Sequence, residues 1–166
     1  MSNAAYYSLL NDGRLTGDVI GAVEATPPVA VTGATLTCTR DTHGGRTIVI
    51  NAAAGCAVTL PNATGTGSIF RFFIGTTITS NSTTIKVSNA TDVMSGRAFV
   101  ISDSAAAVLG YATAASSDTI TLDGTTTGGF AGDVIEVIDA IAGTYLVTVL
   151  TKATGTEATP FSATVS

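Results

Sequence analysis

Charged residues and large aromatic side chains are scarce in this chain of 166 residues. Lysine, arginine, aspartate and glutamate together make up 11% of it, and it has no tryptophan. An ordinary soluble domain is roughly one quarter charged. The seven basic residues are scattered and the formal net charge is −5. A nucleic-acid partner requires clustered lysine and arginine, so this class of partner is excluded.

Long apolar runs are also missing. The richest one, residues 105–115, is too short and too rich in alanine to span a bilayer. Residues 1–10 have neither a basic start nor a long apolar stretch, so we expect no secretory signal and a native start at Met1. We therefore expect no membrane partner.

Cysteine and histidine are nearly absent, which argues against a zinc site. Cys38 and Cys56 are the two cysteines and His43 is the one histidine, so neither a Cys-x-x-Cys pair nor a Cys/His cluster exists. The two cysteines lie in separate strand-like runs, and pairing across adjacent strands stays open. We favour two reduced thiols in the core, because free cysteine is among the most buried residue types.

Threonine and glycine are abundant, with 30 and 18 residues. The branched Cβ of threonine suits a pleated strand, and short β-branched runs alternate with glycine, asparagine, aspartate and proline along the chain. We predict an all-β protein, a β-sandwich or barrel-like domain of about ten short strands. The predicted strands are residues 35–39, 47–51, 56–60, 68–74, 83–88, 97–102, 106–111, 119–122, 133–138 and 145–150.

The N-terminal part of the chain has a different pattern. Turn signals occur at residues 11–13 and 16–18, and the Pro27–Pro28 pair favours an extended path. We predict an extended N-terminal arm over residues 1–33, with a weak helix candidate inside it at residues 4–10. The β domain is predicted over residues 34–166, and its end is interpreted as a possible extended tail.

Two predicted strands are apolar on both faces. Residues 68–74 place Ile69 and Phe73 on the same face as Arg71, opposite the other apolar side chains, and residues 145–150 are similar. A strand of a simple sandwich is expected to be polar on its outer face. We therefore predict that these two strands form a subunit interface.

His43 is the first candidate for chemistry. It lies in the most charged stretch, residues 40–46, where Asp41 is available to orient it. A catalytic or partner-binding histidine is one interpretation. We favour a solvated hairpin tip in which Gly44 and Gly45 supply the turn, because no nucleophile elbow accompanies the histidine. No catalytic residue is predicted.

Residues 65–67 match the start of a dinucleotide fingerprint, but a strand follows them where a helix is needed, so we predict a hairpin loop. Asp118, Asp123, Asp133 and Asp139 lack the ligand spacing of an EF-hand. A carboxylate pair for glycoside hydrolysis and an incidental cation site stay open. We favour turn capping, since each aspartate adjoins glycine, serine or alanine, and we predict no cofactor and no metal.

Two stretches resemble a known family. The first, residues 48–55, 58–61 and 63–67, is similar to β-rich virion proteins of tailed bacteriophages, and also to modules in phage tail fibres and spikes. The second stretch comprises residues 117–129, 132–136, 143–145 and 155–161. The combination resembles the capsid decoration (cement) proteins of tailed phages, notably those of cyanobacterial and marine hosts.

The resemblance implies a small structural β protein, often trimeric, held on the outside of the capsid where capsomers meet. Its partners are then the major capsid protein and further copies of itself in a homotrimer. Its location is the virion exterior, reached from the host cytoplasm during assembly. The family has no catalytic residues to carry over. A phage tail-fibre or receptor-binding β module is the alternative interpretation, and a small hydrolase is a third that the single histidine argues against.

Overall fold

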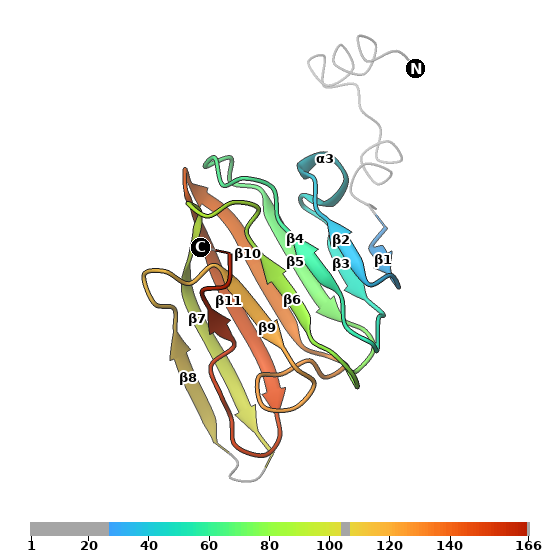
Figure 1. Cartoon of the computed structure of the whole chain (residues 1–166). Helices are drawn as coiled ribbons and strands as arrows, with labels where there is room; N and C mark the ends of the chain where they lie inside the picture. The colour runs from blue at the N-terminus through green and yellow to red at the C-terminus, as the bar shows by residue number, and fades with distance from the viewer. Residues whose placement is uncertain (1–26, 104–106, 166) are drawn as a thin grey trace, which may run out of the picture.

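A computed structural model describes residues 27–103 and 107–165, which form two β-sheets packed face to face (Figure 1). This sandwich confirms the all-β prediction. Each of the ten predicted strands overlaps an observed strand, and two further short strands occur near the ends of the described chain. Residues 1–26, including the helix candidate at residues 4–10, lie outside the described residues.

The larger sheet contains seven strands. In spatial order they are β1 (Val29–Val31), β3 (Thr47–Ile50), β5 (Ile69–Ile74), β10 (Val134–Ile141), β11 (Thr144–Ala153), β7 (Val93–Ser102) and β8 (Val108–Ala112). The smaller sheet contains five, in the order β12 (Phe161–Ser162), β9 (Thr119–Leu122), β6 (Thr83–Lys86), β4 (Ala57–Thr59) and β2 (Thr35–Thr37). A one-turn helix, α3 (Arg40–His43), connects β2 to β3.

The first six strands alternate between the two sheets. β1, β3 and β5 are parallel neighbours in the larger sheet, and β2, β4 and β6 are parallel neighbours in the smaller one. Parallel neighbours cannot be joined by a tight hairpin, so each connection crosses the sandwich. The hairpins predicted around residues 43–45 and 65–67 are therefore wrong, and both segments are connections between sheets.

The inward faces of both sheets form one core. Every second residue of the long strands is buried, as in the alternating pattern of β11. The largest fully buried side chains include Tyr145, Phe70, Phe72 and Ile135 from the larger sheet and Ile120 from the smaller one. Fully burying one such apolar side chain contributes roughly 1.5–3 kcal/mol, so this core holds the two sheets together.

Two segments outside the ten predicted strands also join the sheets. Val29–Val31, from the predicted arm, pair in parallel with β3. Phe161–Ser162, from the predicted tail, pair antiparallel with β9, and Phe161 is buried. Both strands are only two or three residues long and follow a proline, and runs this short carry too little periodicity to be recognised.

Candidate functional site

The outer face of the larger sheet carries a row of apolar side chains that crosses five neighbouring strands. Val49, Phe73, Val134, Leu150 and Phe99 are successive register partners, one from each strand. Phe73, Leu150 and Phe99 are 37%, 50% and 41% exposed. We call this set the outer apolar row. Because contiguous exposed apolar surface marks interaction sites, the row is the candidate functional site.

The row collects residues from distant parts of the sequence. Phe73 and Leu150 come from the two strands that are apolar on both faces, so the sequence located part of the site. Val134 and Phe99 were missed, although the unbroken apolar run from Ala98 to Ile101 is a signal that could have identified β7 as a third such strand. The role of the row as a subunit interface stays a prediction.

Further exposed apolar residues flank the row. Ile101 and Val108 are register partners on one side of it and are 44% and 61% exposed. On the other side Leu146 pairs with Ile138 and is also exposed. The apolar surface therefore continues along β7 to Ile101, whereas on β11 Thr148 separates Leu146 from Leu150. These two strands are the longest and are parallel over ten residues.

A polar row lies directly beside the apolar one. Arg71, Glu136, Thr148 and Arg97 are successive register partners on the same face. The Arg71 guanidinium and the Glu136 carboxylate form an ion pair of 2.8 Å in which both side chains are partly exposed. Such a pair stabilises the fold by about 0–1 kcal/mol. Among the described residues Arg97 makes no ion pair, so its charge faces solvent at the edge of the apolar row.

A hollow of about 310 Å³ lies at the β8 end of the outer apolar row. Gly110 of β8 is the register partner of Phe99, and Ala112 is the partner of Arg97. Because Gly110 and Ala112 have little or no side chain, the sheet surface is recessed beside Phe99. The hollow is lined by Gly96, Arg97, Ala98, Phe99, Gly110, Tyr111 and Ala112.

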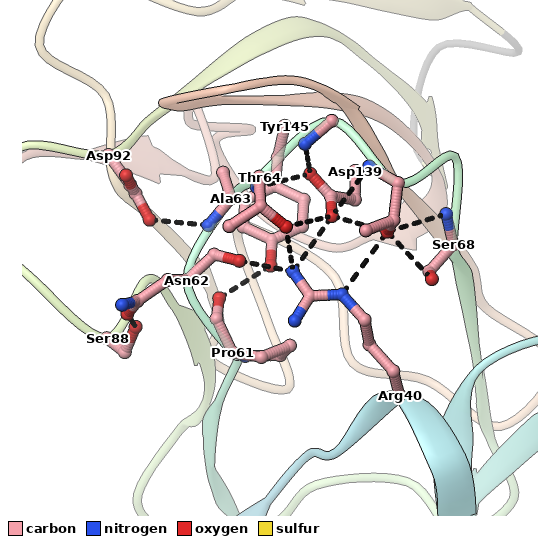
Figure 2. A network of polar contacts seen from close by, with 12 residues as sticks. Arg40, Pro61, Asn62, Ala63, Thr64, Ser68, Ser88, Asp92, Asp139 and Tyr145 are labelled. Carbon is pink, nitrogen blue, oxygen red and sulfur yellow. Dashed lines mark hydrogen bonds and ion pairs between the residues drawn. The ribbon is translucent and has the colours of Figure 1, made fainter.

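The most extensive polar cluster is centred on Asp139, in β10 (Figure 2). Its side chain is fully buried, and its Oδ1 accepts hydrogen bonds from the backbone N–H groups of Thr64 at 2.9 Å and Gly65 at 2.7 Å. Its Oδ2 accepts from the Thr66 hydroxyl at 2.6 Å and from the Arg40 guanidinium at 2.9 Å. This one carboxylate therefore ties α3 and the loop before β5 to the larger sheet.

Hydrogen bonds decide the direction in which the pKa of Asp139 is shifted. Burial by itself raises the pKa of this carboxyl, but the hydrogen bonds from Thr66, Arg40 and Gly65 outweigh burial and hold the pKa well below its ordinary value. Gly65 and Thr66, from the segment that matches the start of a dinucleotide fingerprint, therefore bind the Asp139 carboxylate of their own chain. The prediction that Asp139 caps its own turn is wrong, because it lies within β10 and caps a loop more than 70 residues away.

Two neighbouring side chains extend this cluster into the core. The Tyr145 hydroxyl donates to the Pro61 carbonyl oxygen at 2.6 Å, and burial together with the Asp139 charge raises the pKa of the tyrosine. The buried Asp92 accepts from the Ala63 N–H at 2.7 Å. Figure 2 shows these contacts around the segment from Pro61 to Thr64. The cluster therefore helps to hold the two sheets together, and its polar groups form hydrogen bonds with one another.

His43 is not at a solvated tip. It is the last residue of α3 and only 7% exposed, and the Thr39 backbone N–H donates to its Nδ1 at 3.0 Å. Asp41, its proposed orienter, is exposed. The predicted hairpin is wrong because β2 and β3 belong to different sheets, and the crossing between them folds the histidine ring against the protein.

Two of the other aspartates cap their own turns, as predicted. Asp123 accepts from the N–H groups of Thr125 and Thr127, and although burial raises its pKa these bonds lower it to about 2. Asp133 accepts from the N–H groups of Gly129 and Phe130. In this case burial outweighs the hydrogen bonds and raises the pKa.

Asp118 has a different role from the turn capping predicted for it. It is buried and accepts from the backbone N–H groups of Thr164 and Val165, near the end of the described chain, at 2.8 and 3.1 Å. It also accepts from the hydroxyl of the neighbouring Thr119. Asp118 therefore fastens the C-terminal segment to the smaller sheet.

The two cysteines are free and buried, as predicted. Burial, with a smaller contribution from Cys56, raises the pKa of the Cys38 thiol to about 12, and burial also raises the pKa of Cys56. Both thiols are therefore protonated at neutral pH and unreactive as nucleophiles.

Within residues 27–103 and 107–165, no group of three or more histidine, cysteine, aspartate or glutamate side chains is arranged to hold a metal ion. In the same part of the chain, none of the helical structure has the length and apolar character needed to cross a membrane.

Comparison with known proteins does not extend this description. No family model, no curated protein and no solved structure matches the chain. The outer apolar row, the composition of the chain and the sequence resemblance are therefore the features that bear on function.

Proposed function

We propose that this protein is a structural virion component that binds the outer surface of a tailed-phage capsid and reinforces the contacts between capsomers. The observation that carries the proposal is the outer apolar row, which no other part of the described chain covers. In a chain with so few charges, an apolar row in which Phe73, Phe99 and Leu150 are exposed favours a component of an assembly over a free monomer. The resemblance to capsid decoration proteins supplies the kind of assembly.

The polar groups of the described residues support a structural role. Asp139, Asp133 and Asp123 accept hydrogen bonds from their own chain. The His43 ring is buried and its Nδ1 is engaged by Thr39. Enzyme sites usually present a titratable group in a cleft where it reaches a substrate. These groups instead contribute to the rigidity of the sandwich, which suits a protein that carries mechanical load.

The outer face is large enough for a specific contact. β7 and β11 contain ten residues each, so they are about 33 Å long, and the six strands from β3 to β8 are about 24 Å wide at a spacing of about 4.8 Å. The face therefore measures up to about 800 Å², the area that one partner contributes to a standard interface. We propose that copies of the chain contact one another through this face in a homotrimer.

The proposed homotrimer is tested by native mass spectrometry of the purified protein. We expect species of three chains or a multiple of three, because burial of the outer apolar row removes Phe73, Phe99 and Leu150 from water. Replacing Leu150 by Asp is expected to dissociate it, since a charge would then be buried without a partner. Replacing Thr148 by Ser, on the same exposed face of β11, is the matched control and should leave the trimer intact. A monomer at every concentration would contradict the proposal.

Reinforcement of the capsid is expected to raise the temperature at which particles release their DNA. A trimer that bridges several capsid subunits binds multivalently, and avidity can exceed the affinity of one contact by about 10²–10⁴-fold. Binding only to the assembled shell then stabilises it by a few kcal/mol per site at high occupancy. Because the chain has few charges, the effect should depend only mildly on salt.

The measurement compares particles with and without the protein for DNA release on heating. Equal release temperatures at full occupancy would defeat the reinforcing role. Counting copies per purified virion separates the alternative function: hundreds of copies support capsid decoration, whereas a few dozen or fewer support a tail-fibre or receptor-binding module.

A further inference from the structure

The edge of the larger sheet formed by β8 is open for pairing. Ser102 N–H donates to the Ala107 carbonyl and Thr113 N–H donates to the Gly96 carbonyl, so residues 107 and 113 direct their backbone groups toward β7. Hydrogen-bonded and non-hydrogen-bonded residues alternate along an antiparallel pair. Val108, Gly110 and Ala112 therefore direct their N–H and C=O groups away from β7, and all three residues are exposed.

The other three edges are protected in ways that β8 is not. β1, β2 and β12 contain only three, three and two residues. In addition, Pro27–Pro28 precede β1 and Pro160 precedes β12. Short strands and proline are the usual means by which proteins block pairing at an edge. β8 contains five residues, and residues 107–117 include neither a proline nor a charged side chain.

We infer that β8 pairs antiparallel with β8 of a second copy, about a two-fold axis at Gly110. In this register Gly110 faces Gly110 and Val108 faces Ala112, so all three outward N–H groups of each copy have a carbonyl opposite them. The pairing also joins the two outer faces. The outer apolar row of one copy, ending at Phe99 and Gly110, then continues into that of the second.

The hollow beside Phe99 favours a second copy as the occupant of this edge. With glycine at the axis, no side chain on the outer face obstructs the approach of the two strands, and an added Cβ at Gly110 would meet no atom within 4 Å. The Phe99 side chains then flank a recessed centre from both sides. This contact uses backbone groups at an edge, so it is separate from the proposed trimer contact and does not depend on the capsid function.

A cysteine at the axis tests the register directly. Two residues of a hydrogen-bonded antiparallel pair have Cα atoms about 5.5 Å apart, which lies within the range that a disulfide spans. Gly110→Cys is therefore expected to give a covalent two-chain species on mild oxidation, seen on a denaturing gel. The native cysteines are buried and free and should not contribute.

Val108→Cys is the matched control on the same strand. In the inferred register two such cysteines lie four residues apart along the strand direction, about 14 Å, so this variant should not cross-link with itself. Mixed with Ala112→Cys, it should cross-link. If Val108→Cys cross-links with itself as readily as Gly110→Cys, or if Gly110→Cys stays a single chain, the inferred pairing is wrong.

A charge at the axis tests the pairing without cross-linking. Gly110→Lys places two like charges opposite each other, so native mass spectrometry is expected to show loss of the assemblies that contain the β8 contact. Circular dichroism should match the wild type and unfolding should stay cooperative, because the Gly110 backbone groups do not bond β7. A folded Gly110→Lys variant that assembles like the wild type would overturn the inference, whatever the outcome of the trimer experiment.

Discussion

Replacing Asp139 by Asn is expected to lower the free energy of unfolding by about 3 kcal/mol. The substitution keeps the size of the side chain, but an amide offers only one accepting oxygen to a site where every neighbour is a donor. The N–H groups of Thr64 and Gly65 engage one carboxylate oxygen, and Thr66 and Arg40 engage the other. Breaking a buried ion pair on one side costs about 3–5 kcal/mol, and the partial exposure of Arg40 places the expected value at the lower end.

Glu136→Gln is the matched control for this variant. It is the same change of acid to amide, three residues away on β10, and its partner Arg71 lies on the exposed face. The expected loss is less than about 1 kcal/mol. Urea denaturation followed by circular dichroism measures both variants. Equal losses in the two would show that the buried cluster does not fasten the sheets.

The same cluster predicts how stability depends on pH. The pKa of Asp139 is held well below the ordinary value of 3.8, so its contribution is complete above that value and is lost as the pH falls through the lowered folded-state pKa. Asp123, with a pKa of about 2, acts in the same direction. Asp133, whose pKa is raised, acts in the opposite direction. The wild type should therefore lose stability below pH 3.8 more steeply than Asp139→Asn, and parallel profiles would contradict this account.

Replacing Gly96 by Ala is expected to lower the free energy of unfolding by about 3 kcal/mol, at the upper end of the usual cost of overpacking. A Cβ at this position of β7 would collide with the backbone carbonyl oxygen of Val147, its partner in β11. Neither atom belongs to a flexible side chain, so β7 and β11 must separate locally. This parallel pair extends over ten residues of the larger sheet, so its displacement disturbs the core beneath it.

Gly110→Ala is the control for Gly96→Ala. It makes the same change on the neighbouring strand, where an added Cβ meets nothing within 4 Å. A change within about 0.5 kcal/mol is expected, as for surface sites generally. Thermal and urea unfolding of the two variants give the comparison. A cost for Gly96→Ala no larger than that for Gly110→Ala would show that β7 and β11 adjust without strain.

The sequence by itself determined the fold class and the position of nearly every strand. Alternation with period two and the β-branched composition are local properties, and turn residues such as Asp123 and Gly124 end strands through their own backbone preferences. The sequence around Phe73 and Leu150 is apolar at successive positions and so on both faces of each strand. This pattern indicated that these two strands have apolar outer faces, because side chains alternate between the faces of a strand.

Only the tertiary structure decided which strands are neighbours. It therefore also decided every site that is built from residues far apart in the sequence. Because β1 to β6 alternate between the sheets, the segment around His43 is a connection between sheets with a buried histidine ring, and not the predicted hairpin tip. This alternation also brought Thr64 to Thr66 against Asp139, a pairing that no local pattern encodes. The outer apolar row and the open β8 edge arise in the same way, because register between strands follows from packing of the whole core.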